Sequence, residues 1–310
     1  MSIVAARWPR SHLGGISVMR AARRTLRLDV GAALGVGMLG AVVLAAVFAP
    51  VLVAADPVRV DLTAQFRPPS LTQPMGTDNF GRDVWSRVLH GARLSVGVAA
   101  AATAISVAVS LVMGGLAGYL GGRIDTFISR AIDVTLAFPR FVLAITVAGL
   151  LGAGLGSVVV AIVLVSWAWY ARVIRGLVLQ ARQEQYVQAA EALGAALPRL
   201  MLRHLLPAVG GQVVVLASLD FGRIILTISA LSFLGLGVRP PVPEWGAMLT
   251  EARLFFARNP GLMIFPGLAI FVAVFGANLL GDWLRDVLDP RSYARQRRAS
   301  GPAPREWEVT

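Results

Sequence analysis

Two ionisable side chains, Asp220 and Arg223, lie within a long apolar run of the sequence. Their spacing of three residues places both on one face of a helix, where a carboxylate and a guanidinium can pair. Charged groups are costly inside a bilayer and usually face a cavity or a partner. Two interpretations follow: the pair lines a path for a polar solute, or it neutralises itself inside a helix bundle. Arg140, just after Pro139, is expected instead to extend its charge towards the nearby membrane surface.

Residue types that support catalysis, metal binding or nucleotide binding are scarce in this chain. It has no cysteine, and all 29 Lys and Arg positions hold arginine, so the lysine of a phosphate-binding P-loop is missing. The three histidines, His12, His90 and His204, lie outside the expected membrane spans, which argues against an intramembrane enzyme. We therefore predict no catalytic residue, no cofactor and no metal site.

Composition indicates an all-α polytopic membrane protein. Of the 310 residues, 56% are hydrophobic and 15% are charged, whereas soluble domains have about 45–50% and about 25%. In lipid, backbone hydrogen bonds must close within each segment, so each apolar run is expected to be a helix. We assign the net charge of +12 to arginines in cytoplasmic loops rather than to nucleic-acid binding.

Six apolar runs are long enough to cross a bilayer. With a cytoplasmic N-terminus, the cytoplasmic segments hold 19 arginines and the external segments hold 8, which predicts that both termini are cytoplasmic. Residues 1–29 are expected to form a cytoplasmic segment and residues 292–310 a disordered cytoplasmic tail. The six-helix domain covers 30–291, with spans expected at Val30–Ala54, Leu94–Leu120, Val134–Gly152, Gly156–Tyr170, Val209–Gly237 and Leu262–Leu284.

A polar segment at 171–208 separates the fourth and fifth of these runs. Its alanine-rich part favours a helix, Gly194 suits a left-handed helix end, and Pro198 suits the first turn of a second helix. Pro207 is expected to stop that second helix near the membrane. The predicted helix–turn–helix is either a structural cytoplasmic loop or a docking element for a partner protein.

The same segment resembles the EAA loop of permeases of ATP-binding-cassette (ABC) importers. The triplet corresponds to 188–190, the glycine pair to 194–195, and the hydrophobic-proline end to 204–207. In that family the loop is the coupling helix that docks on the ATP-hydrolysing subunit. The leading glutamate is replaced by glutamine here, and a neutral hydrogen bond is about half as strong as a charged one. The resemblance implies a coupling role for Gln188, Ala189, Ala190, Gly194, Ala195, His204 and Pro207.

Three further motifs, in the right order, extend the resemblance over roughly residues 25–291 to the C-type subunit of dipeptide, oligopeptide and nickel permeases. Asp78 is expected to cap the N-terminus of an external helix. Trp245 is expected to be an anchor at the membrane interface, a gate lip or a dock for a binding protein. The motifs run from Gln73 to Arg93, from Leu231 to Leu249 and from Asn278 to Arg291.

The resemblance implies a type I importer permease with six transmembrane helices in a bacterial inner membrane. It also implies a sister permease, two ABC ATPases that bind ATP and Mg²⁺, and an extracytoplasmic solute-binding protein as partners. Closure of the ATPases would then switch the bundle between inward- and outward-facing states. A stand-alone secondary transporter is the alternative, which internal inverted repeats would favour. Dipeptides, oligopeptides, a nickel chelate and haem all remain open as cargo.

Overall fold

The computed structural model describes residues 30–53 and 55–288, so the predictions for 1–29, 289–291 and the tail at 292–310 lie outside the described residues. Within these residues the regular elements are helices, and an isolated bridge joins Thr77 to Asp83. In chain order they are α2 (Val30–Leu52), η1 (Leu62–Ala64), α3 (Val84–Leu120), α4 (Gly122–Ala137), α5 (Arg140–Leu151), α6 (Leu155–Ala181), α7 (Gln185–Ala192), α8 (Leu197–Leu200), η2 (Met201–Leu205), α9 (Leu206–Phe233), α10 (Trp245–Ala252), η3 (Arg253–Phe255) and α11 (Gly261–Leu288).

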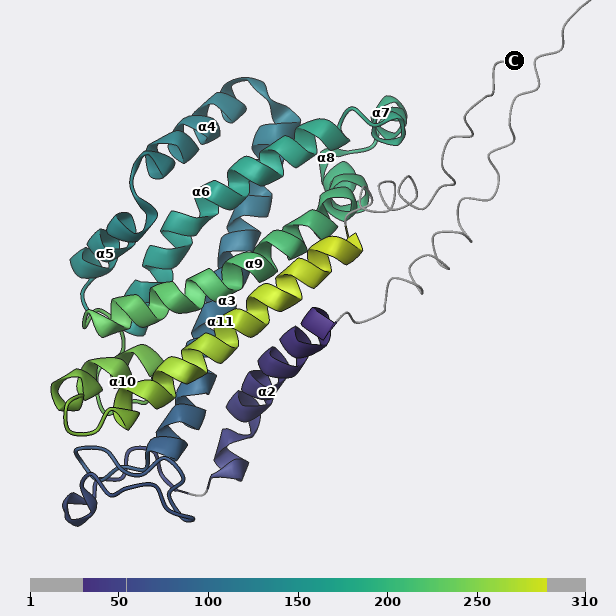
Figure 1. The fold of residues 1–310 in the computed structure, drawn as a ribbon. Coiled ribbons are helices and arrows are strands. Elements are labelled where there is room, and N and C mark those ends of the chain that lie inside the picture. The colour runs from purple at the N-terminus through teal and green to yellow at the C-terminus, as the bar shows by residue number, and fades with distance from the viewer. Residues whose placement is uncertain (1–29, 54, 289–310) are drawn as a thin grey trace, which may run out of the picture.

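The long helices form one bundle around α3, which packs against α2, α6 and α9. Helix α11 lies between α2 and α9, and α2 lies at one edge of the bundle while α4 and α5 lie at the other (Figure 1). Helices α7 and α8 lie at the same end as the start of α2 and the end of α11, and α10 lies at the opposite end (Figure 1). The predicted all-α polytopic fold is confirmed. Five helices are long and apolar enough to cross a membrane, and the bent pair α4–α5 gives a sixth if it counts as one span.

Two glycines allow α3 and α6 to approach closely. A Cβ atom at Gly114 would lie 2.5 Å from the carbonyl oxygen of Ala171, and one at Gly118 would lie 2.8 Å from that of Arg175. Small residues of this kind let helix backbones pack against each other in membranes. The glycine-rich pattern of this segment therefore serves packing within the chain.

The second predicted span is too short, because α3 begins at Val84 and continues unbroken through the bundle. The predicted cap is also wrong: Asp83 caps α3 by accepting from the amides of Trp85 (3.3 Å) and Ser86 (3.2 Å). The Asp78 carboxylate instead accepts from amides in the preceding turn, at Phe80 (2.8 Å) and Arg82 (2.9 Å). Burial raises the pKa of Asp83, although the two amide hydrogen bonds act in the opposite direction.

The third predicted span is not a single helix. Helices α4 and α5 meet at Phe138–Pro139 with a bend of 93°. Proline has no amide hydrogen and its ring collides with the preceding turn, so Pro139 does not continue α4 and instead precedes α5 as its N-cap. Helix α5 packs directly against α6 after a short turn at Gly152–Gly154.

The fourth span extends further than predicted, since α6 continues to Ala181. Its last turns carry arginines that pair with acidic residues of α4. Arg175 Nε lies 2.5 Å from Asp125, and Arg172 Nη2 lies 2.5 Å from Asp133. The polar segment therefore begins inside a helix and not in a loop.

Pro207 does not stop a helix, contrary to expectation. The chain stays helical from Leu197 to Phe233, and Pro207 lies in the first turn of α9. Just before it, Met201–Leu205 form a π-helical turn, in which the amide of Leu206 donates to the carbonyl of Met201. This wider turn accommodates a proline that cannot donate a helical hydrogen bond.

Candidate functional site

Helix α7 ends in a turn that depends on Gly194. This residue has φ of +78°, a left-handed conformation that favours glycine. The amide of Gly194 donates to the carbonyl of Glu191 (3.0 Å), and the amide of Ala195 donates to that of Ala190 (3.1 Å). These two bonds form a Schellman motif, which ends α7 and redirects the chain into α8. The predicted helix–turn–helix is confirmed.

One side of α7 is fixed to the bundle. Val187 is fully buried and packs with Tyr170, Val178 and Leu200, among other residues of α6, α8 and α9. Beyond that apolar contact, the Tyr119 hydroxyl of α3 donates to Glu191 Oε1 at 3.3 Å. Helix α7 is therefore attached to α3 and α6 by both apolar and polar contacts.

Arg182, between α6 and α7, strengthens this attachment. Its guanidinium donates to the carbonyl oxygen of Tyr119 (2.9 Å), lies over the Tyr119 ring (5.1 Å to the centroid) and faces Glu191 at 3.7 Å. Charge and ring contacts thus converge on the C-terminal end of α3.

The outer side of α7 is open. Gln188 is exposed, and its side-chain amide makes a long hydrogen bond of 3.4 Å to the carbonyl of Gln183. Ala189 is exposed and Leu193, at the tip, is 89% exposed. Ala190 is half-buried. Small and apolar side chains at a protruding tip leave room for close approach of another protein surface.

The remaining predicted loop residues lie around the turn and the base of this hairpin. Ala195 and His204 are half-buried, and the His204 ring lies 6.4 Å from that of Tyr186 on α7. Pro207 is exposed at the start of α9. The structure therefore brings six of the seven predicted coupling residues to the α7–η2 hairpin, with Pro207 just beyond it.

A second cluster surrounds the Asp220 carboxylate in α9, which is 1% exposed. Arg140 binds it with two parallel hydrogen bonds of 3.1 Å, and Arg223 donates to Oδ1 at 3.0 Å. The Tyr170 hydroxyl donates to Oδ2 at 3.1 Å. The predicted contact between Asp220 and Arg223 is therefore present.

Arg140 was expected at the membrane surface, and this expectation is wrong. Its guanidinium points inward because Asp220 offers a bidentate partner, and it also donates to Ser166 Oγ at 3.2 Å. The bend at Pro139 places the first residue of α5 against α6 and α9. Neither this contact nor the one from Tyr170 was predicted, because both partners are at least 50 residues from Asp220 in the sequence.

These charged residues line a cavity of about 180 Å³ between α5, α6 and α9. Most of its wall is apolar. The Arg140 side chain is 30% exposed and that of Arg223 is 61% exposed, so the two cations reach the opening while the carboxylate lies beneath them. The ten lining residues are Arg140, Phe141, Ala144, Ile162, Val165, Ser166, Asp220, Arg223, Ile224 and Thr227.

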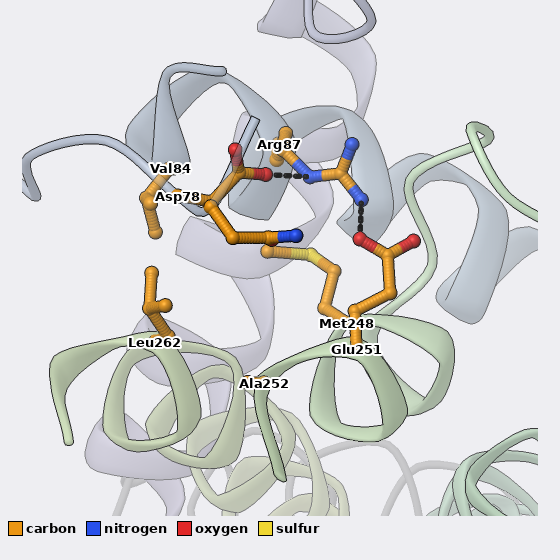
Figure 2. A pocket seen from close by; sticks show the side chains of 8 residues that line it. Asp78, Val84, Arg87, Met248, Glu251, Ala252 and Leu262 are labelled. Carbon is orange, nitrogen blue, oxygen red and sulfur yellow. Dashed lines mark hydrogen bonds and ion pairs between the residues drawn. The ribbon is translucent and has the colours of Figure 1, made fainter. Parts of the chain in front are cut away.

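A third charged cluster lies at the opposite end of the bundle, where α3 begins. Arg87 Nη2 donates to Glu251 at 3.2 Å and its Nε lies 3.7 Å from Asp78, as Figure 2 shows. Arg82 also contacts both acids, with 2.6 Å to Asp78. Both arginine side chains are 2% exposed. Three buried charges and the partly buried Glu251 thus fix the loop before α3 to α10.

Trp245, at the start of α10, is not an anchor at the membrane interface. It is 1% exposed, and its indole nitrogen donates to the carbonyl of Val88 at 3.0 Å. The adjacent Glu244 is fully buried; it caps α10 through the amides of Gly246 and Ala247 and accepts from the Ser95 hydroxyl at 2.9 Å. Helix α10 is therefore built into this end of the bundle.

Comparison with known proteins agrees with this arrangement of helices and loop. Residues 110–292, from the second half of α3 through α11, match the family described as "Binding-protein-dependent transport system inner membrane component". The chain belongs to this family. It is a permease subunit of an ABC importer, a multi-pass inner-membrane protein that acts in transport rather than as an enzyme.

Three named permeases are similar to this chain over most of their length. The dipeptide transport system permease protein DppC of Alkalihalophilus pseudofirmus is 38% identical over 91% of this chain and 93% of its own length. The nickel transport system permease protein NikC of Escherichia coli is 43% identical over 76% and 85%. The glutathione transport system permease protein GsiD of Pectobacterium atrosepticum is 44% identical over 72% and 74%.

Proposed function

We propose that this permease forms half of a translocation path for peptides or a related small solute, and that α7 is the coupling helix through which ATPase subunits move it. The position of α7 carries the proposal. Its tip is open at Leu193, while Val187 and Glu191 attach it to the transmembrane helices. A helix held in this way moves together with the bundle.

The partners in this proposal are a sister permease, two ABC ATPases and an extracytoplasmic solute-binding protein. ATP and Mg²⁺ are bound by the ATPases, and the chain, which contains no lysine, lacks the lysine of a standard P-loop. The α7 end faces the cytoplasm together with both termini, and the α10 end faces the binding protein. Peptide cargo is supported by two of the relatives above, which are named for dipeptide and glutathione transport.

Cross-linking from the tip of α7 tests this proposal. The chain has no cysteine, so Leu193→Cys introduces a single thiol that a benzophenone maleimide can label. After illumination of the complex purified through a tag on this chain, we expect an adduct with the subunit whose sequence contains a Walker A motif. The matched control is Leu71→Cys, fully exposed in the loop before α3. An ATPase adduct from position 71, or none from position 193, would contradict the proposal.

A further inference from the structure

We propose that the cavity between α5, α6 and α9 selects solutes that carry a carboxylate. Arg223 binds that group, and Asp220 is the positioning residue that holds Arg223 and Arg140 at the opening. The inference rests on the proposed function, because it treats the cavity as part of the translocation path. It goes further in assigning a charge preference to the path itself, separate from any preference of the binding protein.

The balance of charge in the cavity favours an anion. Three of its ten lining residues are ionisable: two guanidinium groups and one carboxylate. The site therefore carries one excess positive charge. The surrounding wall includes Phe141, Ile162 and Ile224, and an apolar wall screens charge less than water does.

The Asp220 carboxylate has no acceptor capacity left for cargo. A carboxylate offers about four lone-pair positions on two oxygens. Oδ1 accepts from Arg140 and Arg223, and Oδ2 accepts from Arg140 and Tyr170. A cationic solute or a bare divalent metal ion would meet two guanidinium groups and an already saturated carboxylate.

The two arginines, in contrast, have donors to spare. A guanidinium has five N–H groups in a fixed fork that matches a carboxylate. Among the described residues, the Arg223 guanidinium makes one hydrogen bond, to Asp220, and the side chain is 61% exposed. A largely exposed arginine in a membrane-spanning helix requires a polar partner. A solute carboxylate supplies one, with two charge-assisted hydrogen bonds.

The electrostatic part of the inference can be tested without knowing the cargo. Thr227 lines the cavity one turn beyond Arg223, and Thr227→Cys places a single thiol there. In the assembled transporter, we expect a sulfonate-bearing methanethiosulfonate to react with this thiol about tenfold faster than a trimethylammonium-bearing one, relative to their rates with free cysteine. Adding Arg223→Gln should remove most of that preference, whereas adding Arg123→Gln, an exposed arginine of α4, should not. Equal relative rates for the two reagents would overturn the inference. A carboxylate of the sister subunit that already neutralises Arg223 would give that result.

The recognition part is tested by uptake into proteoliposomes containing the whole transporter. Dialanine and dialanine amide are each supplied at concentrations that saturate the binding protein. Arg223→Gln should lower dialanine uptake about tenfold and leave amide uptake within about twofold, and Arg123→Gln should change neither. Equal loss for both substrates would overturn carboxylate recognition. If the unmodified transporter moves neither compound, the proposed peptide cargo fails, and the thiol rates still decide whether the cavity prefers anions.

Discussion

The hydroxyl of Tyr119 lies 3.3 Å from Oε1 of Glu191, which joins the last turn of α3 to the exposed helix α7. Helix α3 begins at the other end of the bundle, where Arg87 contacts Glu251 of α10. With 37 residues, α3 is about 55 Å long at 1.5 Å per residue. A single helix thus connects the proposed ATPase contact with the end assigned to the binding protein.

Loss of the Tyr119 hydroxyl should loosen α7 without unfolding the bundle. Tyr119→Phe keeps the ring beneath Arg182 but removes the hydrogen bond to Glu191, an interaction worth about 1 kcal/mol. We expect the amides of 185–192 to exchange about fivefold faster with deuterium, a rate change that corresponds to about 1 kcal/mol. Tyr186→Phe is the control, since its exposed hydroxyl makes no hydrogen bond with the described residues. Equal exchange in the two variants would contradict a tether at Tyr119.

Breaking the turn after α7 should uncouple ATP hydrolysis from transport. Gly194→Pro requires φ near −65° where the chain has +78°, and it removes the amide that donates to Glu191. We expect normal membrane levels and continued ATP hydrolysis, with solute moved per ATP reduced at least about tenfold. Ala196→Pro is the control, because Ala196 already has φ of −65°. Full coupling in the Gly194 variant would argue against docking through α7.

Adding one methyl group between α3 and α6 should destabilise the permease. Gly114→Ala places Cβ 2.5 Å from the carbonyl oxygen of Ala171, so the helices must separate. The expected cost is about 1–3 kcal/mol, seen as a lower midpoint of thermal unfolding in detergent. Gly97→Ala, also in α3, meets no atom of the described residues within 4 Å and should be neutral or stabilising, since alanine favours helix by about 1 kcal/mol. Equal unfolding midpoints for the Gly114→Ala and Gly97→Ala variants would indicate that α3 and α6 can separate at little energetic cost.

Neutralising Asp220 should lower the free energy of unfolding more than neutralising an exposed acidic residue does. Asp220→Asn leaves Arg140 without its buried carboxylate, and losing one partner of a buried ion pair costs about 3–5 kcal/mol. Asp133→Asn removes the partner of Arg172 at an exposed site, where pairs contribute about 0–1 kcal/mol. Denaturant-induced unfolding in mixed micelles compares the two. Similar losses would show that Asp220 does not organise the cluster.

Much of this fold could be predicted from the sequence, because a membrane-spanning helix is recognised by a long run of apolar residues. The apolar run that forms α11 and the helix–turn–helix at Gly194 both follow local rules of length, glycine and proline placement. The predicted helix boundaries were less accurate where a helix continues from an apolar stretch into a polar one. Arg172 and Arg175 were predicted to lie in the polar segment after the fourth span. They belong to α6, because their acidic partners on α4 stabilise them within the helix.

At the candidate sites, contacts between residues close in sequence were predicted and contacts between distant residues were not. The Asp220–Arg223 contact is local, at three residues, and helical spacing predicts it. The contacts from Arg140 and Tyr170 join residues 80 and 50 positions apart, and a single sequence contains no signal for them. Trp245 was misplaced for a related reason: its burial depends on α3, more than 150 residues earlier in the chain.

The π-helical turn at Met201–Leu205 fixes the rotational register between the two ends of one continuous helix. A wide turn of this kind accommodates one more residue than an α-helical turn, and each residue corresponds to about 100° of rotation. If the turn relaxed to α-helix while α7 and α8 stayed fixed, Asp220 would rotate away from Arg140 by about that angle. In that case the two ends of this helix would rotate relative to each other through a change in the hydrogen bonds of five residues.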